Sequence, residues 1–120
     1  MSNHEQIEKA ITAHSSWKVK LRKIITEGHS SISVNDIRAD NRCEFGKWIQ
    51  GPIIGIDPAA KAEIARLHAD FHRAAAKVAD AALHGKTKEA EAMMAMGGEY
   101  GVTSSKLTVA MINWKKKVPA

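Results

Sequence analysis

The chain has 120 residues, 44% of them apolar, which is enough for one domain with a core of its own and leaves no room for a second. Its formal charge of +5 is scattered over the sequence, with Lys115-Lys116-Lys117 as the one run of lysines, which favours a solvated basic surface over nucleic-acid binding. No apolar run approaches the ~20 residues of a membrane span and no signal-peptide pattern is present, so we expect a cytoplasmic protein without membrane insertion.

The first expected helix covers about residues 3–28. Ser2 and Glu5 fit a capping box at its start, and Gly28 suits its end. His14 falls in the middle of its apolar stripe, where a buried imidazole needs a hydrogen-bond partner or a metal. On its own this position favours a satisfied core residue over a ligand. The stripe consists of Ile7, Ala10, Ile11, His14, Trp17, Leu21, Ile24 and Ile25.

Residues 29–52 are expected to form a connector and then a short helix. Asp40 is the expected N-cap, Cys43 would lie in the first turn, and Gly51-Pro52 would end the helix. The helix dipole at that position lowers the pKa of a thiol and favours the thiolate, which binds metals and reacts with oxidants. Cys43 is the only cysteine, so it has no internal disulfide partner, and a buried structural thiol is the alternative interpretation.

The third expected helix covers about residues 57–84, with Asp57 as its N-cap and Pro58 at its first position. Many alanines in this range raise its helix propensity. His68 and His72 are four residues apart, so their imidazoles project from one face of the helix, one turn apart. This spacing supplies half of a metal site.

The last expected helix covers about residues 87–117 and begins with Thr87 as its N-cap. Gly97, Gly98 and Gly101 fall inside this range. Each glycine costs about 1 kcal/mol relative to alanine in a helix, which indicates a bend or a close helix contact. The methionines recur at helical spacing and are interpreted as core residues, not as a soft-metal site.

Together these elements predict an all-α fold. We expect one domain over residues 1–120, antiparallel and four-helix-bundle-like, with three long helices and a short cysteine-bearing helix. His14 and the pair His68/His72 lie near the middles of their helices. They can therefore meet in one layer of the bundle.

Three histidines and one cysteine from three segments form a closed tetrahedral ligand set for zinc: His14, Cys43, His68 and His72. A di-iron carboxylate site is excluded because the chain contains no Glu-x-x-His pair. A zinc-protease helix would need glutamate directly after the first histidine, where Ala69 stands. Four protein ligands leave no coordination position for a substrate water, so we expect no enzymatic activity and a structural or sensing role instead.

Parts of the sequence resemble the chemoreceptor zinc-binding domain family of bacterial sensors. The resemblance implies a small helical bundle that holds zinc through His14, Cys43, His68 and His72. It also implies a homodimer and an output through a chemoreceptor or diguanylate cyclase signalling module. The segments that carry the resemblance are Ala13-His14-Ser-Ser-Trp17-Lys18, Asp40-x-x-Cys43-x-Phe45-Gly46-Lys47-Trp48 and His68-x-x-Phe71-His72.

Three roles remain open at this point. The first is a regulatory module in which zinc or a hypochlorous-acid-type oxidant sets the position of the Cys43 segment. The second is a structural zinc site in a homodimeric interaction domain, and the third, least favoured, is a small metalloenzyme with an open site. In each case a carboxylate should offset the charge of the metal, and Asp36, Asp40 and Asp70 are the candidates to accept an N–H from a ligand histidine.

Overall fold

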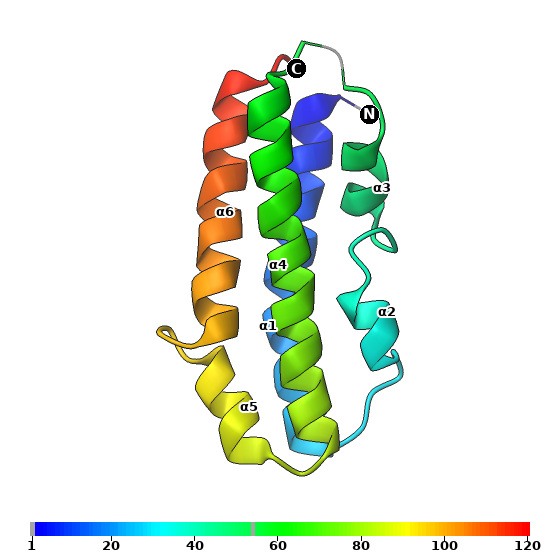
Figure 1. Ribbon diagram of the computed structural model, residues 1–120, viewed down its shortest axis with the longest axis vertical. Coiled ribbons are helices and arrows are strands. Elements are labelled where there is room, and N and C mark those ends of the chain that lie inside the picture. Colours follow the sequence, from blue (N-terminus) through cyan, green and yellow to red (C-terminus); the bar gives the residue numbers. More distant parts are fainter. Residues whose placement is uncertain (1, 54) are drawn as a thin grey trace.

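The structure is a computed structural model that describes residues 2–53 and 55–120. The described chain is built from helices and loops, which confirms the expected all-α class (Figure 1). None of these helices combines the length and the apolar character needed to cross a membrane. In chain order they are α1 (Asn3–Glu27), α2 (Val34–Arg38), α3 (Glu44–Gln50), α4 (Pro58–Leu83), α5 (Thr87–Met94) and α6 (Glu99–Lys117).

The helices are arranged as a bundle with four positions (Figure 1). α1 and α4 run in one direction, and the segments α2–α3 and α5–α6 run in the other, so each segment is antiparallel to the one before it. Two of the four positions are thus filled by pairs of shorter helices. α4 is the central element, because it contacts every other helix.

α1 and α4 lie within one residue of their expected ranges, and their expected caps are present. The side chain of Ser2 accepts a hydrogen bond from the backbone N–H of Glu5. Asp57 caps α4, with Pro58 as its first helical residue. α1 ends at Gly28, whose φ of 75° lies in the left-handed region. Local sequence therefore determines where both long helices begin.

The expected helix over 87–117 is interrupted between α5 and α6. A Cβ at Gly98 would lie 2.2 Å from the carbonyl oxygen of Ala92, so this turn excludes any side chain at that position. The prediction of Thr87 as N-cap is wrong, because Thr87 is already helical and Lys86 holds the N-cap position without a side-chain hydrogen bond. The glycines thus mark a break in the helix.

The core is apolar apart from three histidines and the hydroxyl group of Tyr100. Its largest fully buried side chains include Tyr100, Phe71, Ile7, Leu21 and Ile37. Among the described residues the buried polar side chains are His14, His68 and His72, which are 3%, 1% and 3% exposed. A buried polar group without a partner costs about 1–3 kcal/mol, so each of these rings needs a partner for its nitrogen atoms.

Candidate metal centre

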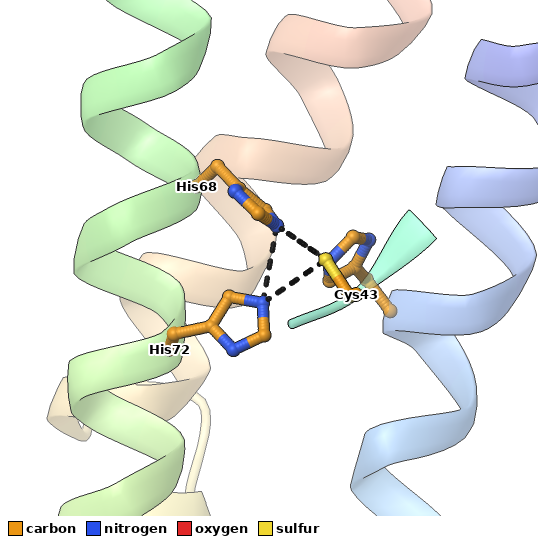
Figure 2. Close-up of side chains that lie close together, drawn as sticks. Cys43, His68 and His72 are labelled. Carbon is orange, nitrogen blue, oxygen red and sulfur yellow. Dashed lines mark hydrogen bonds between the residues drawn. The ribbon is translucent and has the colours of Figure 1, made fainter. Parts of the chain in front are cut away.

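His68 and His72 project from one face of α4 toward Cys43 (Figure 2). Their Nε2 atoms lie 3.1 Å apart. The Nδ1–H of His72 donates a hydrogen bond of 2.9 Å to the carbonyl oxygen of Ile37 on α2. A carbonyl can only accept, which assigns the hydrogen of the neutral ring to Nδ1 and leaves a lone pair on Nε2. That lone pair points into the bundle.

His14 is held in the same way by its own helix. Its Nδ1–H donates a hydrogen bond of 2.7 Å to the carbonyl oxygen of Ala10, one turn earlier in α1. Its Nε2 lies 3.1 Å from Nε2 of His68. One nitrogen of His14 is therefore satisfied by the backbone, and the other is aimed at the histidines of α4.

Cys43 occupies the N-cap of α3, not its first turn. The prediction of Asp40 as the N-cap is wrong, because Cys43 has the extended backbone of a cap and its sulfur accepts a hydrogen bond of 3.3 Å from the N–H of Gly46. From this position Sγ lies 3.2 Å from Nε2 of His68 and 3.7 Å from Nε2 of His72.

Gly46 is the residue that lets this turn reach the histidines. A Cβ there would lie 1.7 Å from the carbonyl oxygen of Asp40 and 3.2 Å from Cε1 of His68. No side chain fits between these atoms. The turn that carries Cys43 packs against α4 only because position 46 is glycine.

We call His14, Cys43, His68 and His72 the ligand cluster. One donor atom from each lies within 4.8 Å of all the others. Zinc bonds to nitrogen and sulfur imply tetrahedral edges of roughly 3.3 Å between two nitrogens and roughly 3.6 Å between nitrogen and sulfur. Four of the six separations in the cluster are 3.1 Å for two N–N pairs and 3.2 and 3.7 Å for two S–N pairs, and the two that involve His14 with His72 and with Cys43 lie within 4.8 Å. These separations and this donor set fit a tetrahedral zinc ion.

Hydrogen bonding alone does not account for these contacts. Nε2 of His68 has three close neighbours, the sulfur of Cys43 and the Nε2 atoms of His14 and His72. A ring nitrogen carries one hydrogen or one lone pair, so it can satisfy one of the three. The Nε2 lone pairs of His14 and His72 also point toward Nε2 of His68. A cation at the centre of the cluster is the arrangement that satisfies the three nitrogen atoms and the sulfur together.

Burial keeps the histidines in the form that binds metal. Removal from water lowers the pKa of His14 to about 4 and that of His68 to about 3. It also lowers the pKa of His72, partly opposed by the hydrogen bond to Ile37. All three rings are therefore neutral at pH 7, with a lone pair free for coordination.

The expected low pKa of the Cys43 thiol is wrong for the metal-free protein. Burial raises the pKa of Cys43 more than the neighbouring backbone N–H groups lower it. The loss of hydration outweighs any lowering of the thiol pKa by the helix dipole. A bound cation is therefore needed to hold the sulfur as thiolate at neutral pH.

Aromatic rings enclose the cluster. Phe45 contacts the rings of His68 and His14 edge-on, with centroid distances of 5.1 and 5.9 Å. Phe71 meets His14 in the same way at 5.0 Å. Trp48 lies one layer further out, against Phe45 at 5.7 Å. Phe45 and Phe71 thus belong to the core and also shield the ligand rings from water.

No carboxylate of the three candidates holds a ligand histidine. Asp36 pairs with Arg42 at 3.8 Å, and Asp70 pairs with Arg66 at 3.3 Å on the exposed side of α4. Asp40 contributes its backbone carbonyl, 3.7 Å from the Cys43 sulfur. Backbone carbonyls orient His14 and His72 instead. Sequence patterns of charged residues cannot reveal such partners, because every residue has a carbonyl.

The chain matches the model of a known protein family. The family model described as chemoreceptor zinc-binding domain covers residues 14–79, more than half of the chain and all four members of the ligand cluster. The chain matches none of the curated proteins and none of the solved structures with which it was compared. Because the matched span covers more than half of the chain and includes the three histidines and the cysteine of the cluster, the chain belongs to the chemoreceptor zinc-binding domain family.

Proposed function

We propose that this protein is a zinc-binding regulatory domain of bacterial signal transduction, with His14, Cys43, His68 and His72 as the zinc ligands. The observation that carries the proposal is the approach of four donor atoms to within 4.8 Å in an otherwise apolar core. Zinc in such a site supplies a fixed positive charge that holds the Cys43 sulfur as thiolate.

The proposed role is regulatory because the ligand set is closed. With four protein ligands, tetrahedral zinc has no position left for a substrate water, so we propose no catalytic activity. Cys43 is the one anionic ligand and the one that is partly exposed, whereas the three histidines are buried. Loss of zinc or oxidation of this sulfur therefore changes the site at a single, accessible atom.

The Cys43 segment is suited to transmit that change. It caps α3, a helix of seven residues joined by loops to α2 and α4. Release of the sulfur removes one of the links between α3 and the histidines of α4 and leaves the contacts of Phe45, while the packing of α1, α4 and α6 does not depend on that bond. We propose zinc level, a hypochlorous-acid-type oxidant, or both as the input, and a chemoreceptor or diguanylate cyclase module as the output, in a homodimer.

A structural zinc site in a homodimeric interaction domain is the alternative. The two roles differ in what zinc removal does. A structural site loses its fold with the metal, as zinc-dependent domains do. A sensor keeps its bundle and changes only around α3. The extensive apolar core of α4 with α1 and α6 favours the sensor.

The direct test is the zinc content of the purified protein and of single variants. We expect one zinc per chain, and loss of zinc in Cys43→Ala and His68→Ala. His84→Ala is the matched control, since His84 is the exposed C-cap residue of α4 and lies outside the cluster, and it should retain one zinc. Wild-type protein without stoichiometric zinc, or equal loss in His84→Ala, would contradict the proposal.

A further inference from the structure

A row of aromatic rings leads from the ligand cluster to the opposite side of the bundle. Phe45 meets the ring of His68 with 5.1 Å between the ring centroids. Trp48 lies 5.7 Å from Phe45, and Trp114 lies 5.9 Å from Trp48. Each distance is typical of a direct contact between two aromatic side chains. The row therefore connects α4, α3 and α6 through side chains in contact.

The last contact of the row crosses the bundle diagonally. α3 and α6 occupy opposite positions, with α4 and α1 between them (Figure 1). Among the described residues no backbone approach joins α3 to α6, so the long side chains of Trp48 and Trp114 bridge the gap. Trp114 is buried and Trp48 is partly buried. A shift of α3 therefore reaches α6 at this pair of rings.

Trp114 is next to a group of contacts that holds the end of α6. Its carbonyl oxygen accepts a hydrogen bond of 3.0 Å from the N–H of Val118. The Nε2–H of His4 donates a hydrogen bond of 2.6 Å to the carbonyl oxygen of Val118, and the side-chain amide of Asn3 donates one of 3.1 Å to that of Pro119. We call Asn3, His4, Val118 and Pro119 the terminal clasp. It fastens the end of α6 to the start of α1, at the end of the bundle where both termini lie (Figure 1).

The loop that follows α3 contacts the terminal clasp as well. A Cβ on Gly55 would lie 3.0 Å from Cγ of Pro119, so the loop passes directly against the clasp. α3 thus adjoins the clasp in two ways, through the pair Trp48 and Trp114 and through the loop at its end. The position of α3 relative to α4 is therefore felt at this end of the bundle.

We propose that the terminal clasp is the place where metal occupancy of the ligand cluster is read out, and that Trp48 and Trp114 carry the change across the bundle. The inference rests on the proposed function and names the surface on which the output module would act. Cys43 caps α3 and His68 lies on α4, so the two helices are held together when both side chains bind one ion.

In that state the ring of Trp48 is held against Trp114. When the link between α3 and α4 is lost, α3 shifts, Trp114 loses its neighbour, and the last turn of α6 loosens together with the clasp. The long helices stay packed, and the change is confined to the pair of rings and the clasp. Contiguous contacts alone do not prove such a coupling, so it must be measured.

The bridge between the two tryptophans is tested first, in the protein as purified. Trp48→Leu removes the ring that contacts Trp114 and keeps an apolar side chain. We expect hydrogen exchange of the amides of residues 115–118 to become at least about fivefold faster than in the wild type, which is the lower end of typical coupling between sites. Exchange in the middle of α4 serves as the reference for global unfolding.

Tyr100→Leu is the matched control for this exchange experiment. Tyr100 is a buried aromatic residue of the same helix, but its ring contacts Phe71 at 5.4 Å, outside the row. Exchange at residues 115–118, relative to α4, should stay at the wild-type rate in this variant. No acceleration in Trp48→Leu, or the same acceleration in both variants, would overturn the bridge whether or not the protein binds zinc.

The dependence on zinc is measured at the same amides. Chelation of the wild type should accelerate their exchange by at least about fivefold. Trp114→Leu keeps all four ligands but lacks the receiving ring, so it should bind one zinc per chain and show no effect of zinc at residues 115–118. Full zinc uptake by the wild type without a change at these residues would overturn the inference and leave zinc binding intact. A protein that takes up no zinc would refute the proposed function and the read-out together.

A coupling between two sites must also act in the reverse direction. His4→Ala removes a donor of the terminal clasp and lies outside the ligand cluster. It should lower the zinc affinity, by up to the factor by which zinc slows exchange at the clasp. His29→Ala is the control, since His29 is an exposed histidine that lies 3.4 Å from Glu27 and outside the clasp. Equal zinc affinities of His4→Ala and His29→Ala would contradict the coupling.

Discussion

The Nδ1–H of His72, on α4, donates a hydrogen bond of 2.9 Å to the carbonyl oxygen of Ile37, on α2. Ile37 is 1% exposed, so its side chain anchors α2 in the core while its carbonyl orients a proposed zinc ligand. The bond connects the short helix before Cys43 to the ligand cluster without using a charged residue. α2 is thereby part of the site.

Ile37→Ala should weaken both the fold and the site. The cavity left by the isoleucine should cost about 2–5 kcal/mol of unfolding free energy. A shift of the carbonyl away from His72 should also weaken zinc binding by about 10–100-fold, as the loss of a ligand-orienting partner does. Leu107→Ala is the control, since Leu107 on α6 is also 1% exposed. It should match the stability loss and keep the zinc affinity; equal affinity losses in both variants would show that α2 has no special role.

Gly46→Ala should remove zinc without unfolding the bundle. The added Cβ would clash with the carbonyl oxygen of Asp40 at 1.7 Å, so the turn that carries Cys43 must move away from α4. Zinc content should fall well below one per chain, while far-ultraviolet circular dichroism stays close to that of the wild type. Gly97→Ala provides the matched control, because a Cβ at Gly97 has no neighbour within 4 Å. Full zinc content in Gly46→Ala would mean that the turn can adapt.

The approach of His14 to His68 and His72 was predictable from sequence because helix periodicity is a local feature. The spacing of His68 and His72, and the place of His14 in an apolar stripe, follow from helix periodicity. The contacts that complete the site are not local. The carbonyl of Ile37 and the space at Gly46 depend on how α2 and α3 pack on α4, and a backbone atom leaves no trace in residue type.

The difference between local and tertiary features also explains which predictions were wrong. The helix dipole at Cys43 is a local feature, whereas the burial that raises its pKa is tertiary. The glycines in the expected last helix indicated an irregularity. They did not reveal that the helix is interrupted between Met94 and Glu99. Local patterns thus predicted most of the helices and the faces that carry the three histidines, and packing determined the rest.

Removal of zinc should lower stability without abolishing the fold. With free zinc at about 1,000 times its Kd, binding adds about 4 kcal/mol to the free energy of unfolding. A strong chelator should therefore lower the Tm by roughly 10 °C or more for a chain of this size. The apolar core should keep the helices formed, as measured by circular dichroism before and after chelation. In Cys43→Ala the chelator should have little effect on Tm, and complete unfolding of chelated wild type would favour the structural role.

His14→Leu should separate function from stability. The imidazole of His14 is 3% exposed and lies against Phe45 and Phe71, with its pKa lowered to about 4 by burial. In the absence of metal, leucine avoids the burial of a polar ring whose Nε2 has no cation to bind, and such replacements are often neutral or stabilising. We therefore expect chelated His14→Leu to unfold at the same denaturant concentration as chelated wild type or at a higher one. With zinc the order of the two stabilities should reverse, because the variant has lost a ligand and the wild type gains the binding free energy.

Urea unfolding of both proteins, with and without zinc, measures this reversal of the order of stability. A variant that is less stable than wild type under both conditions would show that His14 contributes to the fold by itself, apart from any metal.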